Sequence, residues 1–210
     1  MEKYYITTAI AYVNAAPHIG FALELCQADA LARYNKIKGN DVYFLTGTDE
    51  HGTKIEQTAN ALGIAPQELA DKNSRLFLDI GKKLNISNDD FIRTTSDLHT
   101  RGAQKFWKKI EEAGDLYEKE YEGLYCVGCE VFVLEKDLLN GDCAIHKKRP
   151  VALKEKNYFF KLSKYSNKIK KLILSDELLI LPESRRNEFL SFLEDGLKDV
   201  SFSRPKKSLQ

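Results

Sequence analysis

The first fifty residues alternate between short apolar runs and a longer segment with one apolar side. Residues 4–13 are rich in β-branched and aromatic side chains, which predicts a buried strand. Residues 21–38 repeat apolar positions at helical spacing and stop before Gly39, which predicts a helix. Residues 41–52 begin as a second strand and run into a polar loop. This order predicts a βαβ unit with a parallel sheet and a right-handed crossover.

Helical periodicity also dominates the next sixty residues. Helices are expected over 53–62, 66–84 and 96–113, with a short third strand over 90–95. For the first helix, spacing assigns the inward face to Leu23, Cys26, Ala30, Leu31 and Tyr34. For the helix over 96–113, it assigns Phe106, Trp107 and Ile110 to the inward side.

The pattern changes after residue 115. Short alternating runs between Leu116 and Phe160 are typical of β-structure, and helices are expected again over 164–175 and 183–197. The fold class is therefore α/β, a βα domain that carries a small β-rich insertion.

Composition narrows the class of protein without identifying its chemistry. The 210 residues hold 32 basic and 31 acidic side chains, and 43% are hydrophobic, which is usual for a globular protein and excludes collagen, coiled coils and disorder. No apolar run approaches the roughly 20 residues of a membrane span, and the N-terminus lacks a signal-peptide pattern. With four Cys in the chain, we do not expect a disulfide scaffold. We expect a cytoplasmic protein without membrane contact.

Basic side chains gather in one segment. Residues 147–171 contain ten Lys or Arg and a single acid, Glu155. Such a segment can contact the phosphates of a nucleic acid, or it can simply be a solvated face. Charge alone leaves both interpretations open.

Three Cys and one His have the spacing of a metal site. Cys126, Cys129, Cys143 and His146 form C-x2-C-x13-C-x2-H. Two turns that each present two ligands can close a tetrahedron around zinc, and thiolates favour zinc over hard cations. Four protein ligands leave no open position, so the metal should be structural. The alternative is three buried Cys and a surface His.

Two further groups lie where the first two strands are expected to end. His18, Ile19 and Gly20 open the first helix, where backbone N–H groups suit phosphate, and the imidazole can donate a hydrogen bond to it. Asp49, with Glu50 and His51 after it, could bind an ammonium group or a metal, or transfer protons. Taken alone, these residues are equally compatible with a structural role for the His and with a solvated loop after the second strand. No G-x-G-x-x-G or G-x-x-x-x-G-K-[ST] motif is present, which argues against dinucleotide enzymes and P-loop NTPases.

Together these motifs resemble one family along essentially the whole chain. AYVNAAPHIGFALE is similar to the H-[IL]-G-H signature of class I aminoacyl-tRNA synthetases. The later runs resemble bacterial methionyl-tRNA synthetases, in the same order: FLTGTDEHGTKI, DDFIRTTSDLH, YEGLYCVGCE, NYFFKLSKY and RRNEFLSFLEDGLKDVSFSRP. The resemblance implies a ligase that activates methionine with ATP and then transfers the methionyl group to tRNA(Met). Mg would accompany ATP as part of the substrate.

The resemblance also implies an organisation. A Rossmann-like, nucleotide-binding parallel-sheet domain is expected to begin in residues 1–114, to be interrupted by a zinc-binding connective-peptide insertion in 115–196, and to resume in 197–210. The Cys/His set would hold one structural zinc per chain. The sequence does not contain the family's K-M-S-K-S loop, so we expect it to be the N-terminal part of the enzyme. It should be inactive alone, and a C-terminal half would complete it if the enzyme is split.

Residue by residue, the resemblance assigns roles at both strand ends. The ATP signature comprises His18, Ile19, Gly20 and Phe21, where Phe21 replaces the final His and cannot donate to phosphate. Asp49 corresponds to the carboxylate that binds the substrate ammonium, Ile10 and Tyr12 to positions beside methionine, and Arg204 to an arginine of the catalytic region. The alternatives are a stand-alone zinc-containing tRNA- or RNA-binding module, or a class I synthetase for another amino acid.

Overall fold

The computed structural model describes residues 1–129, 131–194, 196–201 and 203. The chain divides into two compact units, which are described separately. The first is built mainly from Met1–Lys105, and the second mainly from Phe106–Tyr125 and the described residues from Phe132 onward. The predicted domain borders at residues 114 and 196 stay predictions.

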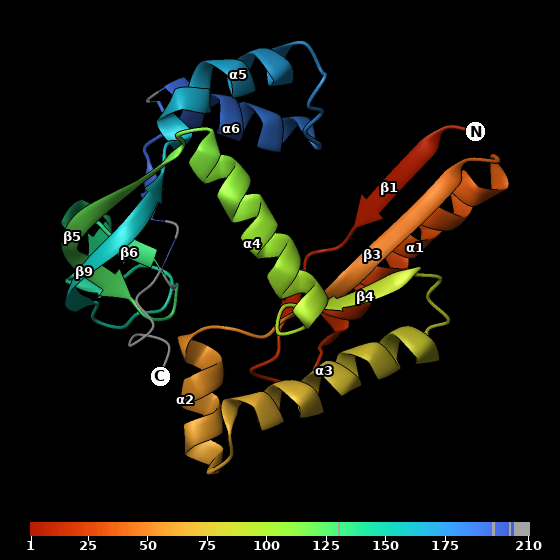
Figure 1. Ribbon diagram of the computed structural model, residues 1–210, viewed down its shortest axis with the longest axis horizontal. Helices are drawn as coiled ribbons and strands as arrows, with labels where there is room; N and C mark the ends of the chain where they lie inside the picture. Colours follow the sequence, from red (N-terminus) through yellow and green to blue (C-terminus); the bar gives the residue numbers. More distant parts are fainter. Residues whose placement is uncertain (130, 195, 202, 204–210) are drawn as a thin grey trace. The chain divides into compact units, whose positions relative to one another are not determined.

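A parallel sheet forms the centre of the first unit. Its strands are β1 (Lys3–Thr7), β2 (Ala11–Tyr12), β3 (Asp41–Asp49) and β4 (Asp90–Arg93). Every pairing is parallel, and β3 lies between β4 and β1 (Figure 1). β2 pairs with the end of β3 on the side of β1. The predicted βαβ unit is thereby confirmed, and so is the short third strand.

The edge strand next to β3 is interrupted where the sequence predicted one continuous strand. Thr7 pairs with Leu45 and Ala11 pairs with Thr48, so four residues advance on the edge while three advance on β3. The extra residue is a bulge-like irregularity, of the kind that re-aims side chains at the end of a strand. The positions affected include Ile10, which lies between the two short strands.

Helices α1 (Ile19–Ile37), α2 (Thr53–Leu62) and α3 (Pro66–Lys83) enclose the core of this unit. Phe44, Thr46 and Thr48 alternate along β3 and are all at most 3% exposed, so their face of the sheet is the buried one. Helix α4 (Asp97–Glu112) follows β4 and runs into the second unit. The apolar cluster on β3 comprises Val13, Phe21, Leu25, Ala28, Ala32, Phe44, Ile55, Ala59, Leu69, Ala70 and Phe77.

The inward face predicted for α1 was wrong. Leu23, Leu31 and Tyr34 are between 50% and 59% exposed, and Cys26 is exposed as well. The buried positions are instead Phe21, Leu25, Ala28, Asp29, Ala32 and Asn35. The reason is that α1 carries apolar residues on two sides, and two polar residues on the inner side find partners there. Asp29 binds Arg33 and Ser87, and Asn35 donates to the Leu31 carbonyl.

The second unit combines β-strands with short helices. Strand β5 (Leu116–Cys126) pairs antiparallel with β9 (Val151–Phe160) from Leu116 to Tyr125. Around them lie β6 (Val131–Val133), η1 (Glu135–Asp137), β7 (Leu138–Leu139), β8 (Asp142–Cys143) and β10 (Val200–Ser201). The remaining elements are η2 (Leu162–Tyr165), α5 (Ser166–Leu174) and α6 (Glu183–Glu194). Both predicted helices are thus present.

Smaller contacts hold this unit together. Ile173, Leu193 and Leu197 form a cluster between α5 and α6. Trp107 of α4 meets the ring of Tyr158 edge to face at 5.3 Å, as expected of an inward side chain. Phe106 is 62% exposed, so its predicted inward position was wrong.

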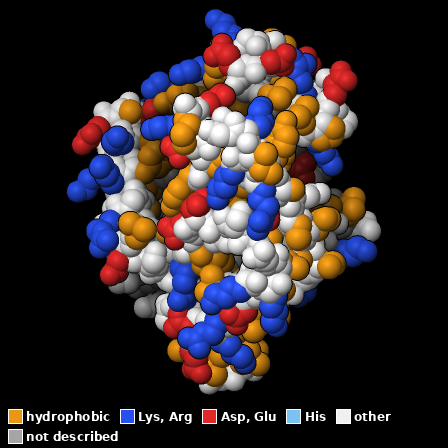
Figure 2. All heavy atoms as spheres, turned by 90° about the vertical axis from the view of Figure 1, so that its right-hand side faces the viewer, with side chains coloured by type: hydrophobic (Ala, Val, Ile, Leu, Met, Phe, Trp, Pro, Cys, Tyr) orange, Lys and Arg blue, Asp and Glu red, His pale blue; other side chains and the backbone are white. Residues whose placement is uncertain are grey.

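The surface mixes apolar and charged side chains. On the face in Figure 2, hydrophobic side chains reach the surface among both signs of charge. Within the described residues, no helix is long and apolar enough to cross a bilayer.

Candidate functional site

Three parallel strands end at the same edge of the sheet. β2 ends at Tyr12, β3 at Asp49 and β4 at Arg93. Tyr12 and Asp49 are register partners, so their side chains leave the same face of the sheet from neighbouring strands, whose backbones lie about 4.8 Å apart. In open α/β sheets, ligands bind at this carboxyl edge.

Hydrogen bonds from both neighbouring strands fix the backbone and carboxylate of Asp49. Its carbonyl accepts from the Val13 N–H at 3.3 Å. Its carboxylate accepts from the Thr94 hydroxyl and from the His51 N–H, each at 3.5 Å. Asp49 is half-buried, so its charge is partly shielded from water while remaining within reach of a ligand.

A buried ion pair stands directly behind Asp49, and the sequence analysis did not single it out. The Glu50 side chain is 0% exposed and accepts from Arg93 Nε at 2.7 Å and Nη2 at 2.9 Å. The Thr48 hydroxyl donates to Glu50 at 2.8 Å, and the Thr95 hydroxyl donates to its other oxygen. Burial alone raises the pKa of Glu50, but the hydrogen bonds from Arg93, Thr95 and Thr48 outweigh it and hold that pKa below its ordinary value.

The same network reaches Asp49 through one hydroxyl. Thr94 Oγ1 accepts from the Glu50 N–H at 2.8 Å and donates to the Asp49 carboxylate. Arg93 also binds Asp71 of α3, and the hydrogen bonds that its guanidinium donates to Glu50 and Asp71 raise the pKa of that guanidinium. The sequence does place an acid and an arginine at the ends of two predicted strands. Whether they pair depends on the register of those strands in the sheet.

His18 caps the first helix with its ring. It is the N-cap residue of α1, with extended backbone, and its Nδ1 accepts from the Gly20 N–H at 3.0 Å. In a neutral imidazole the proton is then on Nε2, which can donate outward. A Cβ on Gly20 would lie 2.9 Å from Cε1 of His18, so glycine is what lets the ring fold back over the helix. Because α1 begins seven residues after β2 ends, its N-terminus belongs to the carboxyl edge.

The other signature residues divide between surface and core. Ile19 is 86% exposed, whereas Phe21 is 5% exposed and meets the Phe77 ring edge to face at 4.8 Å. The Phe21 side chain therefore packs in the core, and its backbone N–H donates to the His18 carbonyl at 3.1 Å. The described signature thus offers one imidazole, that of His18.

The residues assigned to the methionine side chain lie on β2 and just before it. Ile10 is 39% and Tyr12 is 40% exposed, so both offer apolar surface at the carboxyl edge. The Lys54 ammonium stands 5.3 Å from the centroid of the Tyr12 ring. Arg204 lies outside the described residues.

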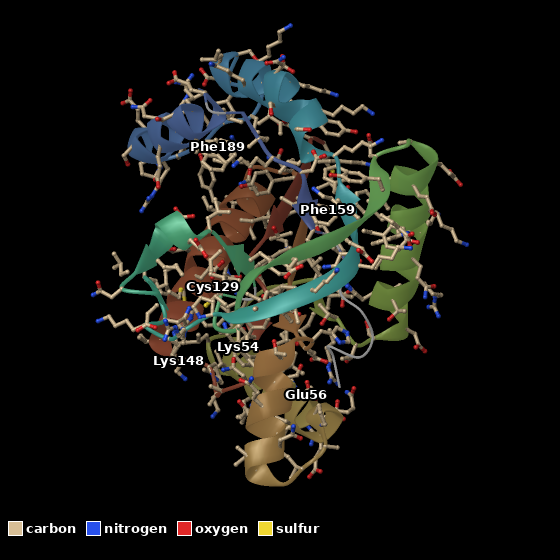
Figure 3. The ribbon with its side chains drawn as sticks, turned by 90° about the vertical axis from the view of Figure 1, so that its left-hand side faces the viewer. Lys54, Glu56, Cys129, Lys148, Phe159 and Phe189 are labelled. Atoms are coloured by element: carbon tan, nitrogen blue, oxygen red, sulfur yellow. The ribbon has the colours of Figure 1, made fainter. Side chains whose placement is uncertain are left out.

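The predicted zinc ligands converge. One ligand atom from each of Cys126, Cys129, Cys143 and His146 lies within 4.8 Å of the others. Cys126 and Cys143 are buried, and Figure 3 shows Cys129 in the same β-rich segment. The Cys129 N–H points at Cys126 Sγ over 3.4 Å, a contact that stabilises a thiolate. Three Cys sulfurs and one imidazole gathered this closely can hold a metal ion, and closure around a tetrahedral zinc would draw them to about 3.3–3.8 Å of one another.

Acids of β5 and of the residue just before it partly neutralise the basic segment. Across the β5–β9 pair, Lys156 binds Glu118 at 2.5 Å and Lys154 approaches Glu120 at 3.9 Å. Lys164 binds the buried Asp115 at 2.6 Å. These contacts lower the positive charge that the segment presents to a polyanion.

Comparisons with known proteins show which proteins this chain resembles. Methionine–tRNA ligase of Rhizobium meliloti is 48% identical over 207 residues, which cover 97% of this chain and 40% of the relative. The Streptomyces coelicolor enzyme is 45% identical over 212 residues, 97% of this chain and 39% of the relative. The chain thus spans about 40% of the length of the curated relatives it matches.

Solved structures agree as well, and they confirm the Rossmann-like α/β fold. Mycobacterium tuberculosis methionyl-tRNA synthetase in complex with methionyl-adenylate superposes with a TM-score of 0.92 at 43% identity, over 98% of this chain and 41% of that one. Its free form gives 0.76 at 39% identity, over 97% and 39%. The family described as tRNA synthetases class I (M) matches residues 4–137 and 129–207. The chain therefore belongs to the class I (M) tRNA synthetase family.

Proposed function

We propose that this chain supplies the first part of a methionine–tRNA ligase, which activates methionine with ATP and joins it to tRNA. The methionine carboxylate attacks the α-phosphorus of ATP, giving methionyl-adenylate and pyrophosphate, and the methionyl group then passes to tRNA(Met) with release of AMP. The observation that carries the proposal is the carboxyl edge, where Asp49 and Tyr12 are in register beside the N-terminus of α1. The relatives that cover 97% of the chain support it.

Asp49 binds the ammonium group of methionine in this proposal. Its carboxylate is held by Thr94 and His51 and is half-buried, a setting in which a charge-assisted hydrogen bond is stronger than in bulk water. The backing ion pair of Glu50 and Arg93 is internally neutralised, so it supports Asp49 without competing for the ammonium.

His18 and the first turn of α1 bind the phosphates of ATP. With Nδ1 occupied by the Gly20 N–H, Nε2 of His18 donates to a phosphoryl oxygen, and this bond strengthens as negative charge develops there. Ile19 contributes its backbone N–H group, and the first turn of α1 contributes the positive end of the helix dipole. Gly20, whose N–H donates to His18, has no Cβ to keep the ligand away from the backbone. Phe21 supports the turn from the core.

Ile10 and Tyr12 contact the methionine side chain. An aliphatic group and an aromatic ring suit a polarizable thioether, for which sulfur–aromatic contacts are favourable. Arg204 is assigned to the catalytic region on the resemblance alone.

The Cys/His cluster holds one structural zinc in this proposal. Cys126, Cys129, Cys143 and His146 supply four ligands, so the metal cross-links the two turns and leaves no position for substrate. Mg accompanies ATP as part of the substrate. The ligase would act in the cytoplasm, together with tRNA(Met) and the residues that make up the rest of the relatives' length.

Methionine-dependent exchange of pyrophosphate into ATP tests the proposal. The chain is assayed alone and after co-expression with the unmatched C-terminal portion of the Rhizobium meliloti relative. Exchange should appear in the complex, with little or none from the chain alone. Asp49→Asn in the complex should lower exchange by about a hundredfold or more, since it removes a charged partner of the substrate.

Asp41→Asn is the matched control, because Asp41 is an exposed acid at the opposite end of the same strand. It should leave exchange unchanged. A folded, zinc-loaded complex that shows no exchange with methionine, or exchange that survives Asp49→Asn, would overturn the proposed function. Exchange with leucine, valine, isoleucine or cysteine in place of methionine would reassign the amino acid.

A further inference from the structure

Lys54 stands over an aromatic ring beside the proposed ammonium site. Its ammonium lies 5.3 Å from the centroid of the Tyr12 ring, and Tyr12 is the register partner of Asp49. Figure 3 shows Lys54 at the N-terminal end of α2. A cation and a carboxylate are therefore both neighbours of one half-exposed tyrosine at the carboxyl edge of the sheet.

The position of Lys54 is electrostatically unfavourable for the chain by itself. It is the second residue of α2, where the helix dipole repels a cation. The N-cap, Gly52, offers no side chain to that helix end. Within the described part of the chain, Lys54 forms no ion pair with a carboxylate, so its charge is balanced only by the face of the Tyr12 ring. An anionic group bound next to Tyr12 would relieve both costs.

An amino acid carries such a group at a fixed distance from its ammonium. Both are attached to the same α-carbon, so a substrate whose ammonium is bound by Asp49 presents its carboxylate only a few ångströms away. The acid on β3 and the cation over Tyr12 thus match the two charges of a zwitterion, while the ring itself faces the apolar part.

We propose that Lys54 binds the carboxylate of the amino-acid substrate and so orients it beside Tyr12. This inference rests on the proposed function, in which Asp49 binds the ammonium. Lys54 is then a binding residue that distinguishes an amino acid from the corresponding amine or amino alcohol. The alternative anion at this edge is a phosphate of ATP, and the test separates the two.

Two ligands that differ only in the carboxylate provide the test. L-methionine and L-methioninol share the side chain and the ammonium, and their dissociation constants are measured by calorimetry on the full chain, together with that of ATP. Lys54→Gln should weaken the binding of methionine about tenfold, which is the effect of losing one partly exposed charged hydrogen bond. It should change the affinity for methioninol less than twofold. Lys54→Arg should restore most of the methionine affinity.

Lys38→Gln is the matched control. Lys38 also stands over a tyrosine, 5.5 Å from the Tyr34 ring, but at the C-terminal end of α1. It should affect neither ligand. Equal weakening of methionine and methioninol by Lys54→Gln, no weakening of either, or weakening of ATP alone would overturn the inference. Failure of the proposed function gives a different result: wild type binds neither ligand, or Asp49→Asn leaves both affinities unchanged.

Discussion

The parallel-sheet region and the β-rich segment of residues 116–160 bury side chains to very different extents. Around β3, eleven apolar residues form one buried cluster, with Phe44 at 0% and Leu25 at 1% exposure. Among the described side chains of 116–160, the buried ones are Cys126, Cys143, Asn157 and Phe159. One region is thus specified by apolar burial, and the other has two candidate metal ligands among its few buried side chains.

Strand pairing does not compensate for this difference. β5 and β9 pair over ten residues, but the ion pairs between them are exposed on both sides, and such pairs contribute little to stability. The strands that extend this sheet to four, β10 and β6, are only two and three residues long, and a sheet with so few buried side chains is marginal in water. The β-rich segment should therefore depend on the proposed metal cross-link, whereas the parallel sheet should not.

The largest expected effect comes from removing the metal, which should unfold one of the two regions and not the other. Structural zinc contributes on the order of 10 kcal/mol to the folding of small metal-dependent modules. Removing it with a chelator, or replacing one ligand by Cys126→Ser, should unfold residues around 126–146 and leave the parallel sheet intact. Metal analysis should give one zinc per wild-type chain, and amide hydrogen exchange should show lost protection in β5, β8 and β9 only.

Cys26→Ser is the control for this experiment, since Cys26 is an exposed cysteine of α1 outside the cluster. It should retain the full zinc content and the wild-type exchange pattern. Zinc that is retained in Cys126→Ser would contradict the ligand set. Loss of protection in β3 after chelation would contradict the independence of the parallel sheet.

The second prediction acts on the sheet and spares the β-rich segment. Gly47 lies on β3, and a Cβ there would sit 2.1 Å from the Ile92 carbonyl oxygen of β4, a contact that only backbone movement can relieve. Gly47→Ala should therefore lower the free energy of unfolding of the sheet by about 3 kcal/mol or more. Urea denaturation followed by circular dichroism measures the loss, and zinc content should stay at one per chain.

A second glycine shows whether the loss is steric. Gly81 lies within α3 with nothing within 4 Å of its would-be Cβ. Gly81→Ala should raise stability by about 0.5–1 kcal/mol, because alanine is the better helix former. Equal destabilisation by both substitutions would mean that the close approach of β3 and β4 is not the cause.

The order of elements could be predicted because each has a distinct local pattern. The strand over 41–49, the helix over 66–83 and the helix over 183–194 all occur where periodicity places them. The inward face of α1 could not be predicted, because its apolar residues lie on two sides and the choice depends on partners such as Ser87 for Asp29. Propensity does not contain such tertiary partners.

The candidate site divides in the same way. Local spacing alone indicated the four candidate metal ligands, whose ligand atoms the fold brings within 4.8 Å of one another. The chain position of Asp49 at a strand end also indicated a ligand-binding edge. The ion pair of Glu50 with Arg93 was not found, since it joins residues 43 apart whose proximity follows from the register of β3 and β4. Register is a property of the assembled sheet, and it cannot be predicted from a single sequence.

The third prediction sharpens the comparison by asking whether the parallel sheet also depends on a buried charge. Glu50→Gln leaves the shape of the side chain but removes the charge that Arg93 binds, which should lower the free energy of unfolding by about 1–3 kcal/mol at pH 7. Because the pKa of Glu50 is held below its ordinary value of 4.5, the carboxylate stabilises the folded state above that pH, and its contribution is lost as the pH falls further.

The difference between wild type and Glu50→Gln should therefore be constant near neutrality and should shrink below about pH 4.5, measured by urea unfolding across pH 3 to 7. Asp71→Asn removes the other acid bound by Arg93, but Asp71 is 54% exposed, so its effect should stay below about 1 kcal/mol. A Glu50→Gln effect as small as that of Asp71→Asn, or one that grows as the pH falls, would mean that apolar packing alone stabilises this edge of the sheet. The network behind Asp49 would then be a consequence of the fold rather than one of its supports.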